Sequence, residues 1–151
     1  MSDLAFADKL NVSRTRVLVV EDCEPFREFI NSILVKSIDL QIIGECSDGL
    51  EAVRKAEELQ PGLILLDIGL PGLNGFEVAK RIFKFVPKPK IVFLTQESCA
   101  DIVHAALSLG ALGYVAKASA GSDLLVAIEA VVQGNQFVSA SLKCPVPTDM
   151  E

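Results

Sequence analysis

Five short apolar runs, separated by segments with helical periodicity, constrain the fold of this chain more than any other feature. The runs are RVLVV (16–20), LQIIGEC (40–46), LILL (63–66), KIVFL (90–94) and GYVA (113–116). Each is too short for a helix and most are rich in β-branched residues, so we expect five strands. Strand and helix therefore alternate along the chain.

The segments between the runs carry the signals of helices. Asp48 with Glu51, and Asn74 with Glu77, have the spacing of a capping box, which predicts two helix starts. Gly134 is expected to end the last helix. Apolar stripes with helical spacing predict the first and last helices, and they consist of Phe26, Phe29, Ile30, Ile33, Leu34 and of Leu124, Leu125, Ile128, Val131, Val132.

This order of elements predicts an α/β fold. Strands that are buried on both faces and joined by helical crossovers form a parallel sheet with right-handed connections. The 151 residues fit a single domain. At this size we expect a flavodoxin-like, doubly wound, five-stranded sheet of order 2-1-3-4-5 with helices on both faces. We place the domain at residues 16–138, after an N-terminal extension (1–15) and before a C-terminal tail or linker (139–151).

Chemically capable side chains stand at the ends of four of the predicted strands. Glu21 and Asp22 follow the first strand, Asp67 the third, Thr95 the fourth and Lys117 the fifth. Ligands of such sheets bind at the carboxyl ends of the strands, near the switch point between strands 1 and 3. We therefore expect these side chains to converge on one edge.

Three carboxylates in one place indicate a cation, and hard oxygen ligands suit Mg²⁺. A carboxylate is also a competent nucleophile in phosphoryl transfer, in which a lysine and a hydroxyl would stabilise the transferring group. The loop GLPGLNG, residues 69–75, would turn sharply beside the metal. It is not the GxGxxG of a dinucleotide site, and the first strand–helix turn, EDCEP, has no glycine.

These motifs resemble the receiver domain of two-component response regulators. The similarity covers residues 16–138 through VLVVEDCEPFREFI, LILLDIGLPGLNGFEVAKRI, IVFLT and GALGYVAKASAGSDLLVAI. KAS and AIEAVVQGNQFVS resemble the branch that usually adds a C-terminal helix-turn-helix DNA-binding domain. The resemblance implies a phosphoacceptor signalling domain that assists only its own phosphorylation and dephosphorylation and is not otherwise an enzyme.

The resemblance also implies residue roles at the metal. Asp67 would be phosphorylated by a sensor histidine kinase. Mg²⁺ would be held by Asp22, Asp67 and the backbone carbonyl of Gly69, with Glu21 acting through water.

On the phosphoryl side, the resemblance implies that Thr95 and Lys117 bind the phosphoryl group. Tyr114 lies where the family carries its aromatic switch residue, although a half-buried edge aromatic is nearly as good an interpretation. Movement of the fourth strand–helix loop would let Tyr114 rotate and alter the face of the fourth helix, the fifth strand and the last helix. We expect that face to contact a second copy or an attached DNA-binding output domain.

The chain departs from the family pattern near Asp67 and after Lys117. Gln96 stands where a small residue is usual and is expected to slow phosphotransfer, and Glu97 could reach the mouth of the site or simply begin a helix. Ala118 replaces the proline that follows the lysine in many receivers, so we expect a trans peptide bond there. His104 and Cys99 are interpreted as structural residues of the fourth helix.

Composition narrows the location and the partners. The 14 basic and 20 acidic residues give a net charge of −6, which argues against direct nucleic-acid binding by this segment. No apolar run reaches the ~18 residues needed to cross a membrane, and the N-terminus lacks a signal-peptide core. Four separated cysteines predict free buried thiols, and we expect a cytoplasmic protein.

Two other functions are compatible with part of this pattern. A haloacid-dehalogenase-type phosphatase also uses an aspartate nucleophile with Mg²⁺, but it needs an acid two residues further on, where this chain has Gly69. A receiver-like interaction module that works without phosphorylation is the remaining alternative, and Gln96 is the residue that supports it.

Overall fold

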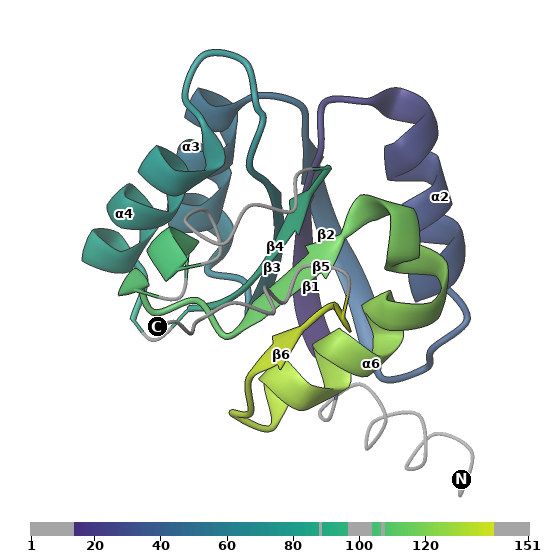
Figure 1. Ribbon diagram of the computed structural model, residues 1–151. Helices are drawn as coiled ribbons and strands as arrows, with labels where there is room; N and C mark the ends of the chain where they lie inside the picture. The colour runs from purple at the N-terminus through teal and green to yellow at the C-terminus, as the bar shows by residue number, and fades with distance from the viewer. Residues whose placement is uncertain (1–13, 88, 97–103, 107, 141–151) are drawn as a thin grey trace, which may run out of the picture.

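A parallel β-sheet forms the centre of the protein (Figure 1), as the alternation of short apolar and helical segments predicts. The computed structural model describes residues 14–87, 89–96, 104–106 and 108–140. Its strands are β1 (Thr15–Val20), β2 (Leu40–Cys46), β3 (Leu63–Asp67), β4 (Lys90–Thr95), β5 (Gly113–Ala116) and β6 (Phe137–Val138). Their order is β2-β1-β3-β4-β5-β6, so the expected order of the first five strands is confirmed.

Two of the helices, α3 (Gly49–Leu59) and α4 (Gly75–Phe85), begin at the predicted capping signals. The structure also describes α2 (Glu24–Leu34) and α6 (Ala120–Val132). The side chains of Asp48 and Asn74 accept hydrogen bonds from the backbone N–H groups of Glu51 (2.8 Å) and Glu77 (3.0 Å). Each cap satisfies a donor that the helix itself cannot, which fixes where α3 and α4 start.

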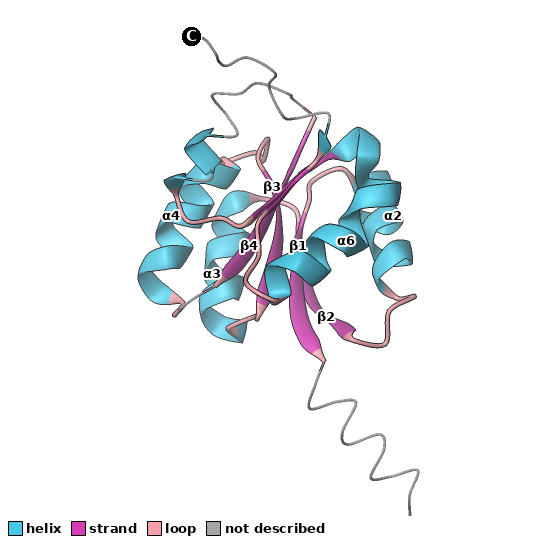
Figure 2. Ribbon diagram, turned by 60° about the horizontal axis from the view of Figure 1, so that its bottom comes forward, coloured by secondary structure: helices cyan, strands magenta, loops and turns pink. Residues whose placement is uncertain are grey.

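The helices cover both faces of the sheet (Figure 2). Helices α3 and α4 pack on one face, and α2 and α6 pack on the other. Alternate residues of a strand point to opposite faces, so Leu18 belongs to the core under α3 and α4, whereas Val17 and Val19 belong to the core under α2 and α6. Burial on both faces explains the unbroken apolar runs of the central strands.

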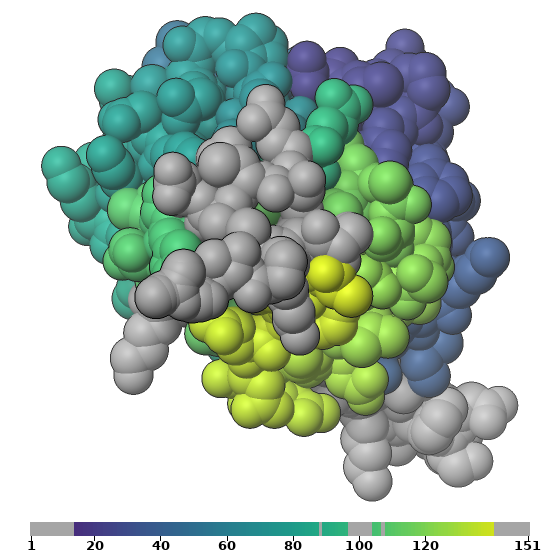
Figure 3. All heavy atoms as spheres, in the orientation of Figure 1, coloured from purple at the N-terminus to yellow at the C-terminus, as the bar shows by residue number. Residues whose placement is uncertain are grey.

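One short strand extends the expected five-stranded sheet. Phe137 and Val138 pair in parallel with Gly113 and Tyr114 of β5, which adds β6 at the edge. In Figure 3, β6 lies at the surface beside α6. The chain reverses after α6 at Gly134, whose φ of +88° favours glycine, as predicted for the end of that helix. Two residues carry no periodicity, so the strand had no signal of its own.

Several smaller expectations need correction. The edge strand β2 is only partly buried, and Phe29 of the predicted apolar stripe is 43% exposed. Cys23 is exposed, unlike the expected buried thiols, because it precedes α2 at the mouth of a cleft. Cys46 is buried as expected, and burial raises the pKa of its thiol to about 11.

His104 lies in a helical stretch with an exposed side chain, whereas Cys99 and Cys144 lie outside the described residues. Among the helices that the structure describes, none has the length and apolar character required to cross a membrane.

Candidate functional site

Strand register brings the predicted site residues to one edge of the sheet. Val20 pairs with Leu66, so Glu21 and Asp67 are the next residues of neighbouring strands. Thr95 ends β4 and Lys117 follows the last residue of β5. These carboxyl ends and the α2 entry border a cleft of about 340 Å³, lined by Asp22, Cys23, Asp67, Ile68, Gly69, Thr95, Gln96 and Lys117.

The loop after Asp67 is shaped by its glycines. Gly72 has a φ of +78°, which side chains other than glycine rarely adopt. At Gly75 a Cβ atom would lie 2.5 Å from the carbonyl oxygen of Asp67, so the start of α4 can pack directly against the end of β3. The N–H of Gly69 donates to Oδ1 of Asp67 at 3.0 Å. The loop thus returns to the carboxylate that precedes it and fixes its direction.

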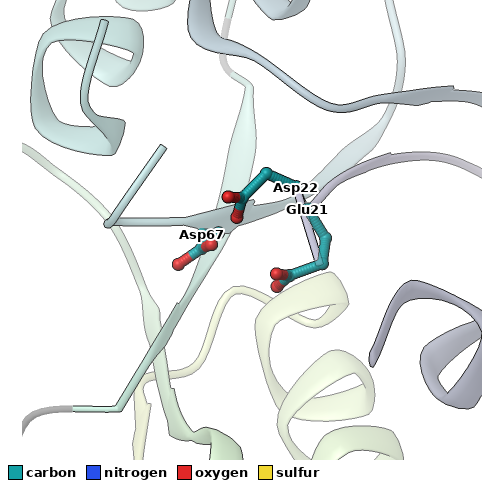
Figure 4. A group of neighbouring side chains, drawn as sticks. All are labelled: Glu21, Asp22 and Asp67. Atoms are coloured by element: carbon teal, nitrogen blue, oxygen red, sulfur yellow. The ribbon is translucent and has the colours of Figure 1, made fainter. Parts of the chain in front are cut away.

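The three predicted carboxylates face one another at the end of β1 and β3 (Figure 4). One oxygen from each of Glu21, Asp22 and Asp67 lies within 4.8 Å of the others. Glu21 and Asp67 are buried, whereas Asp22 is exposed to the cleft. Like charges at this separation repel, so the arrangement needs a compensating positive charge.

Lys117 provides part of that charge. Its Nζ lies 3.0 Å from Oε1 of Glu21 and 3.2 Å from Oδ2 of Asp67. It also stands 5.0 Å from the ring centroid of Phe26, in a cation–π contact. The peptide bond to Ala118 is trans, as expected, since the described residues contain no cis peptide bond.

The electrostatic balance is visible in the pKa values. Burial raises the pKa of the Glu21 carboxyl, and the charge of Asp67 adds to this, although hydrogen bonds from Lys117 and the Cys23 N–H oppose it. Burial also raises the pKa of Asp22, followed by its hydrogen bond to Asp67 and the charge of that residue. Burial lowers the pKa of the Lys117 ammonium, but Glu21 and Asp67 outweigh that effect, so the pKa is raised overall.

The residues present fit a hard divalent cation. Three carboxylates converge within the span of one coordination shell, and an exposed member, Asp22, leaves room for water. Mg²⁺ favours such oxygen ligands and retains several of its waters. One lysine cannot neutralise three acids. Burial, with the neighbouring Asp67 adding to it, makes Glu21 and Asp22 hold their protons more tightly than isolated carboxyls do.

The remaining predicted residues differ in how directly they meet the cleft. Thr95 is buried at the cleft wall, and Gln96 is exposed at its rim. Tyr114 is fully buried rather than half-buried, and its ring centroid lies 6.2 Å from that of Phe93. Glu97 lies outside the described residues.

Sequence reasoning missed side chains that support the site from outside. Phe26 lies against Lys117, Arg27 donates to the backbone of Glu21, and Ser139 bonds the N–H of Ala116 at the end of β5. Phe26 was predicted only as a core residue. The contact between Phe26 and Lys117 joins residues that are distant in sequence, so no local spacing could have indicated it.

Comparison with known proteins agrees with this geometry. Residues 17–129 match the family of response regulator receiver domains. The transcriptional regulatory protein LiaR of Bacillus subtilis is 39% identical over 119 residues, which are 79% of this chain and 56% of LiaR. The chain spans little more than half the length of the curated relatives it matches.

Solved structures show the same architecture. A LuxR-family two-component response regulator from Aurantimonas superposes with a TM-score of 0.82 at 28% identity, covering 86% of this chain and 93% of the other. The receiver domain of RcsB from Salmonella enterica, solved with phosphomimetic BeF₃⁻, gives 0.80 at 25% identity, covering 85% and 96%. The fold, the site and the family match over residues 17–129 agree. This chain belongs to the family of receiver domains found in two-component response regulators.

Proposed function

We propose that Asp67 is the phosphoacceptor of this receiver domain. The supporting observation is that Asp67 belongs to two groups at once. It is part of the carboxylate cluster, whose oxygens lie within 4.8 Å, and it pairs with Lys117 at 3.2 Å. A carboxylate between a cation site and a fixed ammonium is placed to receive a phosphoryl group.

The proposed reaction is an in-line transfer from a phosphohistidine of a sensor histidine kinase. A carboxylate oxygen of Asp67 forms a bond to phosphorus, while the bond from phosphorus to the histidine nitrogen breaks and its electron pair stays on that nitrogen. Lys117 stabilises the negative phosphoryl oxygens, and the Thr95 hydroxyl donates a hydrogen bond to one of them. The chemistry of the domain is limited to its own phosphorylation and dephosphorylation.

Asp22, Asp67 and the carbonyl of Gly69 would hold Mg²⁺, with Glu21 acting through water. When bound, the ion supplies charge that offsets the oxygens of the transferring group. We expect weak binding that Asp22→Ala largely removes. Cys23→Ala alters a neighbouring cleft residue without removing a carboxylate, and should leave the Mg²⁺ titration unchanged.

The test is labelling with acetyl phosphate and Mg²⁺, followed by intact-mass spectrometry. Wild type should gain a phosphoryl group and Asp67→Asn should not. Asp39→Asn, which changes an exposed aspartate away from the cleft, is the matched control and should label like wild type. A label that persists in Asp67→Asn would refute the assignment.

Access to Asp67 is the proposed role of Gln96, which lines the rim of the cleft. Its side chain hinders the approach of the phosphodonor, so Gln96→Ala should label faster with acetyl phosphate. An unchanged or slower rate would show that the side chain points away from the approach path.

The proposed output is a protein–protein surface formed by the predicted fourth helix, most of which lies outside the described residues, together with β5 and α6. Inward-facing Tyr114 can rotate when Thr95 and Lys117 draw toward the phosphoryl group, and α6 presents the exposed apolar side chains of Leu125 and Val126. The partner is a second copy or a DNA-binding output domain. RcsB has been solved in complex with DNA and as dimers on DNA, and LiaR is named a transcriptional regulatory protein.

Beryllofluoride, which mimics the phosphoryl group, tests this output. Self-association of the 151-residue chain should strengthen with beryllofluoride and Mg²⁺ if the partner is a second copy, and an unchanged monomer mass would favour the output domain. With a net charge of −6, the chain should show no specific DNA affinity at physiological salt in either state. Specific DNA binding would contradict the proposal.

A further inference from the structure

A series of polar contacts outside the cleft leads to the backbone of Glu21, the residue before Asp22. The Nη1 of Arg27, in the first turns of α2, donates to the carbonyl oxygen of Glu21 at 2.7 Å. The Nε of Arg27 pairs with Oε1 of Glu45 on β2 at 3.2 Å, and Nδ2 of Asn31 donates to Oε2 of Glu45 at 3.1 Å. Arg27 of α2 therefore binds the carbonyl at the end of β1, and Glu45 of β2 holds Arg27 in place.

This carbonyl belongs to the peptide group that joins Glu21 to Asp22. Because a peptide group is planar, fixing its oxygen fixes the direction in which the Asp22 Cα leaves the strand. The N–H of Glu21 is bonded to the carbonyl of Cys46 at 3.0 Å, and the Glu21 carboxylate is held by Lys117. With Arg27 in place, both backbone groups and the side chain of Glu21 are anchored.

Asp22 needs such an anchor because its own surroundings push it away. It is exposed, and one of its carboxylate oxygens lies within 4.8 Å of an oxygen of Asp67, a separation at which like charges repel. A freely rotating peptide would let Asp22 swing toward solvent, where a carboxylate is better solvated. Holding the peptide keeps a second oxygen ligand close to Asp67 before any cation arrives.

The contact requires an arginine. The planar guanidinium donates from Nη1 to the carbonyl of Glu21 and from Nε to the carboxylate of Glu45. A lysine has a single nitrogen on a flexible chain and cannot make both contacts in this fixed geometry. The Arg27 side chain is only 19% exposed, so solvent competes weakly for these bonds.

We propose that Arg27, oriented by Glu45, is a positioning residue that holds Asp22 for divalent-cation binding. This inference rests on the proposed function, in which Asp22 and Asp67 share Mg²⁺. Arg27 acts through the Glu21–Asp22 peptide and does not touch the cation.

The experiment measures the Mg²⁺ dissociation constant by amide NMR titration of unphosphorylated wild type, Arg27→Ala, Arg27→Lys and Glu45→Gln. Loss of a residue that holds a metal ligand in place commonly weakens metal binding by 10- to 100-fold, so Arg27→Ala should bind about tenfold more weakly. Arg27→Lys should be weakened nearly as much, because lysine cannot make both contacts. Glu45→Gln should lose about two- to threefold, since a neutral amide still accepts one hydrogen bond.

Arg16→Ala is the matched control. Arg16 also donates to backbone carbonyls, those of Leu59 (2.8 Å) and Gln60 (2.9 Å), but at the opposite end of the sheet. Urea unfolding of the same variants without Mg²⁺ separates stability from affinity. Arg16→Ala should lower stability and leave the dissociation constant unchanged, whereas Arg27→Ala should change both.

The possible results separate the positioning role of Arg27 from the proposed Mg²⁺ site itself. If wild type shows no Mg²⁺ titration, the proposed function fails. If wild type binds and folded Arg27→Ala binds equally well, the positioning role is overturned. Should Arg27→Ala not fold, Arg27→Lys and Glu45→Gln carry the same test, and wild-type affinity in both would overturn the role.

Discussion

The two ends of the same β-sheet use charge in opposite ways. At the carboxyl end, three carboxylates face one another across a cleft with Lys117 between two of them. At the amino end, cations meet carbonyl oxygens: Arg16 bonds the last residues of α3, and Lys90 bonds the carbonyl of Val132 at the end of α6. The carboxyl end therefore brings like charges together, whereas at the amino end each cation meets the negative end of a helix dipole.

The difference separates function from stability. The last carbonyls of a helix have no partner within the helix and carry the negative end of its dipole, so a cation there stabilises the fold directly. At the carboxyl end, burial and mutual repulsion raise the pKa values of Glu21 and Asp22, so their ionised forms destabilise the ligand-free protein. Lys117 offsets part of that cost, and a bound cation would offset more of it.

The largest expected effect comes from removing the cation at the acidic end. Lys117→Met leaves the fully buried Glu21 without its ion-pair partner, and breaking a buried pair costs about 3 kcal/mol of unfolding free energy at neutral pH. Urea unfolding measures the loss, and Mg²⁺ should restore part of it. Acetyl phosphate labelling should fall at least ~100-fold, because a donor to the transferring group is lost. Wild-type stability in this variant would show that the acids do not need Lys117.

A contact made by a neutral hydroxyl at the same end should behave differently. The buried Ser139 hydroxyl donates to Oδ2 of Asp123 at 2.7 Å and accepts from the N–H of Ala116 at 3.1 Å. Ser139→Ala leaves the Ala116 N–H without this acceptor and removes one of the bonds to Asp123, which keeps its bond from the Ser122 hydroxyl. The substitution should cost about 2 kcal/mol in urea unfolding.

Unlike the loss in Lys117→Met, the loss in Ser139→Ala should not respond to Mg²⁺ or to pH near neutrality. Ser32→Ala removes an exposed hydroxyl that bonds the carbonyl of Phe29, and should cost almost nothing. A Mg²⁺-dependent loss in Ser139→Ala would mean that β6 is coupled to the acid cluster.

Much of this architecture follows from local pattern. All five long strands match the predicted apolar runs to within one residue at each end. For the central strands the reason is burial on both faces, which leaves no polar alternation to obscure the pattern. The caps Asp48 and Asn74 are equally local. The convergence of Glu21, Asp67, Thr95 and Lys117 follows from strand order alone, since parallel strands end at one edge.

What could not be predicted depends on side chains meeting across the fold. Arg27 reaching the carbonyl of Glu21, and Phe26 lying against Lys117, depend on how α2 packs beside β1 and β5. The inward position of Tyr114 depends on its packing with Phe93. The short strand β6 is stabilised by pairing with β5, because two residues have no pattern of their own.

At the amino end, a single cation should matter less than Lys117. Arg16→Ala removes the bonds to Leu59 and Gln60, and Lys90→Met removes the bond to Val132. Each should cost about 1 kcal/mol in urea unfolding, the value of a cation at a helix C-terminus. Acetyl phosphate labelling should match wild type in both. A labelling defect in either variant would mean that the amino end of the sheet also contributes to phosphorylation.

The smallest expected effect is a pH-dependent gain from Asp22→Asn. A carboxyl with a raised folded-state pKa contributes stability that is complete below its unfolded value and is lost as the pH rises through the folded value. The ordinary values are 4.5 for Glu21 and 3.8 for Asp22, and both are raised in the folded protein. Mg²⁺-free wild type should therefore lose this contribution as the pH rises from about 4 toward neutrality.

Asp22→Asn removes one of these charges, so at pH 7 it should be more stable than wild type in urea unfolding. The gain should stay below ~1 kcal/mol because solvent screens an exposed carboxylate. It should shrink as the pH falls, because the raised pKa of Asp22 lets the folded wild type take up the proton that removes this charge. Asp39→Asn, also exposed but away from the cluster, should show no such trend. Saturating Mg²⁺ should reverse the order, because it stabilises the protein that binds it and Asp22→Asn has lost a ligand. A gain that is independent of both pH and Mg²⁺ would mean that repulsion within the cluster does not limit the stability of this end of the sheet.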